Sequence, residues 1–155
     1  NKGQKCIIWA RFRRDIRKIY NAVKKAGYHP AALLGGLAKK TYKRQKLYFK
    51  KNPECRVLIG QPQACGMGLT LNEASLVIYY SQNSDQRMRK QTEDRCHRPG
   101  QINNVTYITV AARHTVDEAV HEVLCGRRTK QEYMMKYKAT ERVPRGFLEL
   151  ERRAA

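Results

Sequence analysis

The segment RVLIGQPQACGMGLTLNEASLVIYY, residues 56–80, contains two strand-like runs joined by a loop with two glycines. Arg56–Gly60 and Ser75–Tyr80 are rich in Val, Ile, Leu and Tyr, which favour β-strands. The loop between them, Gln61–Leu71, carries Gly66 and Gly68. The segment therefore predicts two strands of one sheet with a glycine turn at its edge.

Strand and helix patterns alternate on both sides of this segment. Further strands are expected at Cys6–Ala10, Ala31–Leu34 and Val105–Ala111. A first helix is expected before Gly27, with Ile16, Ile19, Tyr20 and Val23 on one face. Two more are expected at Ala38–Lys51 and at about Asp85–Arg98, and a fourth begins at Thr115. Such alternation implies right-handed crossovers, and so a three-layer α/β/α fold with a mostly parallel sheet of at least five strands.

The carboxyl edge of the sheet is the edge at which we expect ligands to bind. Ligands of open parallel sheets bind beyond the carboxyl ends of the strands. The prediction places Gly35-Gly36, the Gly66 loop and the segment after Tyr80 at that edge.

The charge of the chain favours polyanionic partners. Its 155 residues include 32 Lys and Arg against 13 Asp and Glu, a formal charge of +19. A charge of this size favours nucleic acid above other partners, although a solvated basic surface kept for solubility is the alternative.

Cysteine usage and hydropathy argue against a secreted protein, a metal-binding protein and a membrane-spanning protein. The five cysteines form no CxxC pair and are odd in number, which indicates reduced thiols in a cytoplasmic or nuclear protein that is not secreted. The four scattered histidines predict no metal site. The longest apolar runs have five residues, whereas a membrane helix needs about 20.

Three side chains near the end of the expected third helix suit an anion. Gln91, Arg95 and Arg98 stand at positions i, i+4 and i+7, which on one helix form a single stripe, and Asp94 could orient Arg98. Planar guanidinium groups suit phosphate oxygens, and the Gly66–Gly68 turn lets backbone amides approach a ligand. A polyphosphate site is indicated, against the alternative of a salt-bridged surface helix.

These residues also carry a family resemblance. QTEDRCHRPGQ, residues 91–101, resembles motif VI of the Swi/Snf-type branch of superfamily-two helicases, and ACGMGLTL, residues 64–71, resembles motif V. IIWARF at residues 7–12 resembles motif IV. Cys65 replaces the usual first glycine of motif V, and Gln82–Asp85 replaces a tryptophan-containing segment, a variation closer to phage or bacterial relatives.

The resemblance implies the second RecA-like lobe of a two-lobe ATPase. Residues 1–138 would form this helicase C-terminal domain and residues 139–155 a tail. Arg98 and Arg95 would be arginine fingers, with Gln91, Asp94, Gly66 and Gly68 at the nucleotide. ATP and Mg²⁺ would be held by the first lobe, because no Gly-Lys-Ser or Gly-Lys-Thr occurs in this sequence. Asp117-Glu118 imitates a Walker B motif, but it is interpreted as a helix cap.

The resemblance further implies contact with duplex DNA at the same edge. The candidate residues are Gly35, Gly36, Arg11, Arg13, Lys39, Lys40, Arg44, Gln63 and Thr70. The leading hypothesis is the second motor lobe of an ATP-dependent DNA helicase or translocase. The alternatives are a non-catalytic basic module that binds nucleic acid and an α/β domain that binds another anion. The sequence does not distinguish unwinding from translocation or remodelling, nor DNA from RNA.

Overall fold

The computed structural model describes residues 4–64, 71–96, 104–126, 129 and 132. The chain divides into two compact units, Asn1–Ser81 with Arg87–Val110 and Gln82–Gln86 with Ala111–Ala155. The first unit contains the sheet, and the second contains helix α4 (Val116–Leu124). The predicted boundary between residues 138 and 139 lies outside the described residues and stays a prediction.

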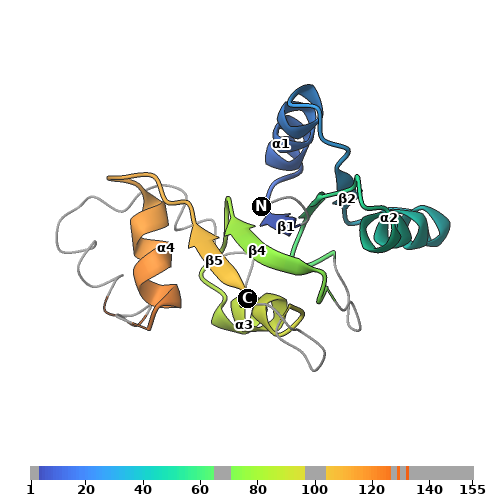
Figure 1. The fold of residues 1–155 in the computed structure, drawn as a ribbon. Coiled ribbons are helices and arrows are strands. Elements are labelled where there is room, and N and C mark those ends of the chain that lie inside the picture. Colours follow the sequence, from blue (N-terminus) through green and yellow to red (C-terminus); the bar gives the residue numbers. More distant parts are fainter. Residues whose placement is uncertain (1–3, 65–70, 97–103, 127–128, 130–131, 133–155) are drawn as a thin grey trace. The chain divides into compact units, whose positions relative to one another are not determined.

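The sheet has five strands, all parallel, in the order β2-β3-β1-β4-β5 (Figure 1). Their bounds are β1 Lys5–Trp9, β2 Ala31–Leu33, β3 Val57–Gly60, β4 Ala74–Tyr79 and β5 Thr106–Thr109. The predicted parallel sheet of at least five strands is therefore confirmed. Each observed strand lies within one or two residues of its expected position.

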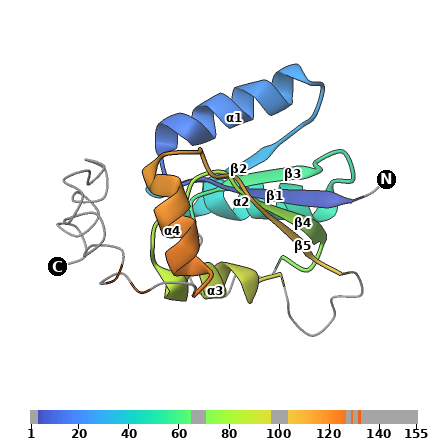
Figure 2. The same cartoon turned by 90° about the vertical axis from the view of Figure 1, so that its left-hand side faces the viewer.

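Helices cover the two faces of this sheet. Helix α1 (Arg13–Lys25) lies on the opposite face from α3 (Gln86–Glu93), as Figure 2 shows. Strand β1 explains the division, because Ile8 belongs to the cluster under α1, whereas Ile7 and Trp9 belong to the larger core on the other face. The expected three-layer arrangement is thus built from alternating side chains.

Helix α1 ends where its sequence predicts. Ile16 is buried on its inner face. Gly27 adopts a φ of +85°, and its N–H donates to the carbonyl of Lys24 while the Tyr28 N–H donates to that of Val23. These two bonds form a Schellman motif, in which glycine accepts the left-handed backbone at no steric cost.

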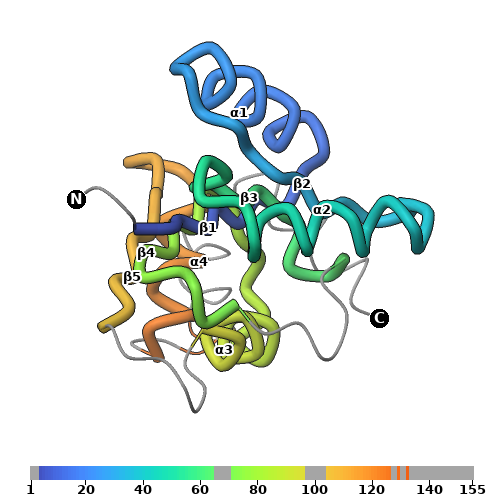
Figure 3. Tube along the Cα trace, turned by 45° about the vertical axis from the view of Figure 1, so that its right-hand side comes forward, coloured from blue at the N-terminus to red at the C-terminus, as the bar shows by residue number. Residues whose placement is uncertain are grey.

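Helix α2 (Lys39–Lys51) buries Phe49 in the larger core and lies beside β2, the edge strand (Figures 1 and 3). At its carboxyl end, the Lys5 ammonium donates to the backbone carbonyls of Phe49, Lys50 and Asn52. The last carbonyls of a helix have no partner within it, so this lysine caps α2 from β1.

The second unit is described through α4. The Thr115 hydroxyl accepts a hydrogen bond from the Asp117 N–H at 3.2 Å, and the Asp117 carboxylate accepts one from the Ala112 N–H. Both Asp117 and Glu118 lie in the first helical turn, which agrees with a capping role for this acidic pair. In the described part of the chain, no helix is long and apolar enough to span a membrane.

Candidate functional site

The residues that follow neighbouring strands are hydrogen-bonded to one another at the carboxyl edge of the sheet. After β1, the Arg11 N–H donates to the Ser81 hydroxyl at 2.9 Å, and Ser81 follows β4. The Ser81 hydroxyl donates to the Asp15 carboxylate of α1 at 3.2 Å. At the edge where ligands are expected to bind, hydrogen bonds therefore connect the segments that follow β1 and β4.

The loop after β2 is held from two sides. The Gly35 N–H donates to the Gln61 side-chain oxygen at 3.1 Å, and the Gly35 carbonyl accepts from the Arg13 guanidinium at 2.5 Å. Gly36 has a φ of +80°, and a Cβ placed there would lie 3.3 Å from the Arg13 Nη2. Because the Gly35 N–H already has a partner, the amide of Gly36 is the better candidate for an incoming phosphate.

Basic side chains continue from this loop onto α2. Its N-terminal residues Lys39 and Lys40 are exposed, the first turn contains no acidic residue, and Ala38 gives no side-chain cap. An open groove along the helix has a mostly apolar surface, lined by Lys40, Lys43, Arg44, Leu47, Tyr48, Lys51 and Asn52. Uncapped N–H groups at a helix start and a row of cations both favour an anionic chain.

The other predicted nucleic-acid contacts divide into two groups. Arg11 is half-buried, whereas Arg13, Arg44 and Gln63 are exposed near the same edge or on α2. Gly66, Gly68 and Thr70 lie outside the described residues, as do Arg98 and Gln101.

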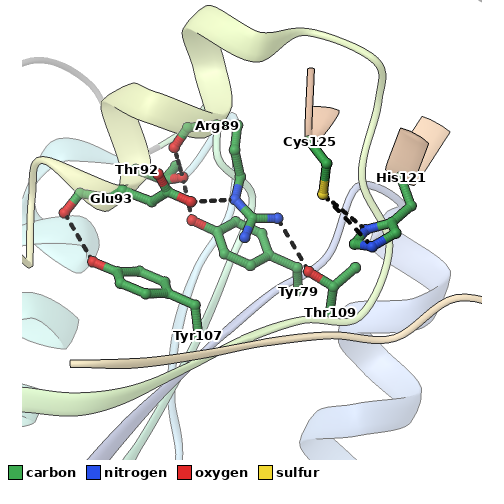
Figure 4. A network of polar contacts seen from close by, with 8 residues as sticks. All are labelled: Tyr79, Arg89, Thr92, Glu93, Tyr107, Thr109, His121 and Cys125. Atoms are coloured by element: carbon green, nitrogen blue, oxygen red, sulfur yellow. Dashed lines mark hydrogen bonds and ion pairs between the residues drawn. The ribbon is translucent and has the colours of Figure 1, made fainter. Parts of the chain in front are cut away.

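A polar network fixes α3 onto the ends of β4 and β5 (Figure 4). The Arg89 guanidinium stacks 3.6 Å from the centre of the Tyr79 ring, bonds to the Glu93 carboxylate at 2.5 Å and donates to the Thr109 hydroxyl at 3.2 Å. The Tyr79 and Thr92 hydroxyls lie 2.7 Å apart in the core, and Thr92 donates onward to the Arg89 carbonyl. These contacts hold the helix that leads into the motif VI segment.

We expect Tyr79→Phe to lower the free energy of unfolding by about 1 kcal/mol, because the variant loses one buried hydrogen bond but keeps the ring. Tyr79 is only 2% exposed, so water cannot replace the bond. Urea unfolding at pH 7 measures the change. Thr92→Val should cost a similar amount, and the double variant should cost less than the sum of the two.

The same variant tests the alkaline behaviour of the fold. Burial raises the pKa of the Tyr79 phenol well above its usual value and raises the pKa of Tyr107 to about 12. Since the unfolded phenols ionise near pH ~10, the stability due to these neutral groups is complete below that pH and is lost as pH rises towards the folded-state values. We expect the free energy of unfolding to fall above pH ~10, and to fall less steeply in Tyr79→Phe.

The expected stripe of Gln91, Arg95 and Arg98 does not form in the described residues. Helix α3 ends at Glu93, so Arg95 lies in the turn that follows. Gln91 is exposed, whereas Arg95 is 3% exposed and its Nε donates to the Gln91 carbonyl at 3.3 Å. The two side chains therefore do not share one exposed face, and the prediction of a continuous helix to residue 98 is wrong.

The core explains why the helix stops early. The Cys96 side chain is fully buried in the larger cluster, and the Arg95 carbonyl accepts a hydrogen bond from the Leu71 N–H at 3.0 Å. These contacts draw the turn inward and carry Arg95 with it. They also join the end of the motif V segment to the motif VI segment through the backbone.

Two polar residues at this edge are absent from the sequence-based set of candidates. Gln61 is the first residue after β3 and Ser81 is the second after β4, and each bonds to the loop of a neighbouring strand. Their position one or two residues after a strand end is the signal that could have found them. It is a weak signal, because polar residues commonly follow strands.

His121 and Cys125 of α4 form a separate pair, with the sulfur 3.6 Å from the imidazole Nε2 (Figure 4). Among the described residues, no group of three or more His, Cys, Asp and Glu side chains could hold a metal ion.

The all-parallel sheet with helices on both faces and a polar, basic carboxyl edge agrees with the class of RecA-like lobes. The family model of the helicase conserved C-terminal domain matches residues 1–100. The chain belongs to this family, as the C-terminal lobe of a superfamily-two helicase of Snf2 type.

Curated relatives agree with this assignment. The chain is 28% identical to Helicase SWR1 of Candida albicans over 122 residues, which is 77% of this chain and 7% of that protein. It is also 28% identical over 113 residues to the Chromatin-remodeling ATPase INO80 of Lodderomyces elongisporus, covering 72% of this chain and 7% of that protein. The chain thus spans less than a tenth of the length of these relatives.

Solved structures share the fold. The C-terminal part of the Fun30 ATPase domain aligns with a TM-score of 0.72 at 22% identity, over 78% of this chain and 39% of that chain. The SWI2/SNF2 ATPase core of Sulfolobus solfataricus in complex with double-stranded DNA aligns with a TM-score of 0.64 at 26% identity, over 82% of this chain and 26% of that chain. The likeness to Fun30 is evidence for the RecA-like fold alone.

Proposed function

We propose that this chain is the second motor lobe of an ATP-dependent DNA helicase or translocase. In this proposal the carboxyl edge of its sheet contacts the DNA backbone. Arg98 and Arg95 act on ATP that is held, with Mg²⁺, by a first lobe. The single observation that carries the proposal is the convergence of the Gly35-Gly36 loop, the exposed Arg13 and the basic start of α2 at one edge of a helicase C-terminal fold.

The nucleic-acid part of the proposal rests on charge and geometry. Lys40, Lys43, Arg44 and Lys51 are all exposed on α2, so a phosphate backbone along this helix would meet several cations in succession. The Gly36 amide and the uncapped start of α2 would add backbone donors. Contacts of this kind go to phosphates, so binding should be independent of base sequence. One structural neighbour is a complex with double-stranded DNA.

In the part of the proposal that concerns ATP, Arg98 is the main residue that acts on the nucleotide. The Arg95 guanidinium is buried and bonded to the Gln91 carbonyl, so it would have to leave this position before it could reach a phosphate outside the lobe. Arg98, three residues further along, is the principal arginine finger in this proposal. Gln91 and Asp94, both exposed, would position the segment, with Gly66 and Gly68 at the nucleotide side of motif V.

The chain itself allows a direct test of DNA binding. We expect a fluorescein-labelled 20-base-pair duplex to bind with an affinity that falls steeply with salt concentration. The salt slope is the slope of the logarithm of the association constant against the logarithm of the salt concentration. Replacing Lys40 and Arg44 together by Gln should reduce the magnitude of this salt slope by about 0.9 for each phosphate contact that is lost. Fluorescence anisotropy at several salt concentrations gives the slope.

The matched control removes the same charge elsewhere. Lys18 and Lys25 are exposed on α1, so their joint replacement by Gln should change the slope less than the α2 pair does. Equal effects of the two pairs would show that net charge, rather than the α2 surface, drives binding. A wild-type slope near zero would refute both the motor proposal and the non-catalytic nucleic-acid module.

A further inference from the structure

Gln61 lies between the two loops of the candidate DNA-binding edge. It is the first residue after β3, and β3 lies between β2 and β1 in the sheet. A side chain at this point can therefore reach the loop after β1 and the loop after β2 at once. Gln61 is half-buried, and its backbone N–H continues the sheet by donating to the Leu33 carbonyl at 3.1 Å.

The Gln61 carboxamide uses both of its ends. Its NH₂ group donates to the Arg11 carbonyl at 2.9 Å, and its oxygen accepts from the Gly35 N–H at 3.1 Å. A carboxamide oxygen only accepts and its nitrogen only donates, so these two partners fix the orientation of the group. No other neutral side chain of this length offers a donor and an acceptor in this geometry.

The two peptide groups that flank the Gly35 Cα are thereby each held by one contact. The Gly35 N–H meets Gln61, and the Gly35 C=O meets the Arg13 guanidinium. The next residue, Gly36, adopts the left-handed backbone that follows from this arrangement, and it precedes the uncapped start of α2. The Gly35 C=O and the Gly36 N–H belong to one peptide group, so Arg13 of α1 fixes the direction of the Gly36 amide directly. Gln61 holds the preceding peptide group, through the Gly35 N–H.

We propose that Gln61 is a positioning residue that holds the Gly35-Gly36 loop in the conformation that binds a phosphodiester backbone. This inference rests on the proposed nucleic-acid function, and Gln61 itself makes no contact with phosphate. The ligand class is a nucleic-acid backbone, because a single-point amide contact beside a row of cations carries no information on base sequence.

Two substitutions separate the two ends of the carboxamide. Gln61→Glu keeps an acceptor for the Gly35 N–H but places an ionised carboxylate against the Arg11 carbonyl. Gln61→Leu removes both bonds at similar size. Gln4→Glu is the control for the added negative charge, since Gln4 is exposed. We expect Gln61→Leu to weaken binding of the labelled duplex about 5- to 20-fold, as the loss of an oriented amide contact would.

The salt dependence distinguishes positioning from loss of charge. Because Gln61→Leu removes no cation, the salt slope should stay within about 0.3 of the wild-type value while the affinity falls. Gln61→Glu should also bind more weakly than Gln4→Glu. Equal affinity of Gln61→Leu and the wild-type chain, or of the two Glu variants, would overturn the inference while leaving the proposed function standing. Failure of the wild-type chain to bind would overturn both.

Amide hydrogen exchange tests the bond first in the wild-type chain, where no variant has to fold. In the wild-type chain, the Gly35 amide should exchange more slowly than the amide of the exposed Gly36. In Gln61→Glu this protection should remain, and in Gln61→Leu it should be lost while the strand amides of β1 and β3 stay protected. Rapid exchange of Gly35 in the wild-type chain would overturn the inference directly.

Discussion

Arg98→Ala, in a protein that carries both lobes, is expected to lower the DNA-stimulated rate of ATP hydrolysis by about 10³- to 10⁵-fold. An arginine finger stabilises negative charge that develops on the transferred phosphoryl group, and alanine leaves that charge without a partner. The loss corresponds to roughly 4–7 kcal/mol of transition-state stabilisation. A coupled assay of phosphate release with saturating duplex DNA measures it.

The control for this prediction is Arg17→Ala. Arg17 is an exposed arginine of α1, so its removal changes the charge equally and should leave the rate within about twofold. DNA binding by Arg98→Ala should also stay near the wild-type level. Retention of most of the hydrolysis rate in Arg98→Ala would remove this residue from the proposed mechanism.

Phe49→Ala is expected to destabilise the isolated chain by about 3–5 kcal/mol. Phe49 is fully buried, and its ring packs in the larger core between α2 and the sheet. Its replacement removes a large apolar side chain and leaves a cavity that neighbours on a sheet can fill only in part. Small domains are stable by about 5–15 kcal/mol, so a loss of this size removes at least about a fifth of the stability. Urea unfolding followed by circular dichroism measures the change.

Leu47→Ala is the matched control on the same helix. Leu47 is 51% exposed, so the change should cost less than about 1 kcal/mol. If the two variants had equal stability, the packing of α2 described above would be wrong.

The sheet could be predicted because its strands carry local signals. β1, β3 and β4 are short apolar runs rich in β-branched residues, and glycine or an Asn-Pro pair ends the helices between them. The parallel arrangement then follows from the alternation of strands and helices. These features are short-range, so they can be read along the chain.

The end of α3 could not be predicted in this way. The sequence from Gln86 onwards is polar, and its helical spacing continues to Arg98 without a glycine or proline break. Whether the helix continues is decided by burial of Cys96 and by the bond from Leu71 to the Arg95 carbonyl. Both contacts join residues that are distant in sequence, so the helical spacing of residues 86–98 does not indicate them.

The proposed role of Gln61 could not be predicted from the sequence for a similar reason. Its two partners come from loops 26 and 50 residues away along the chain. Their proximity depends on the order of strands in the sheet, which places β3 between β2 and β1. The sequence predicted which loops meet at the carboxyl edge, but it did not predict which side chain joins them.

The hydrogen bond from the Leu71 N–H to the Arg95 carbonyl has a consequence for which substitutions can remove it. Both of its atoms belong to the main chain, so the bond itself does not require a particular side chain at position 71 or 95. Only proline at position 71 would delete the donor outright. The linkage between the two segments is therefore a property of the path of the backbone rather than of any one side chain.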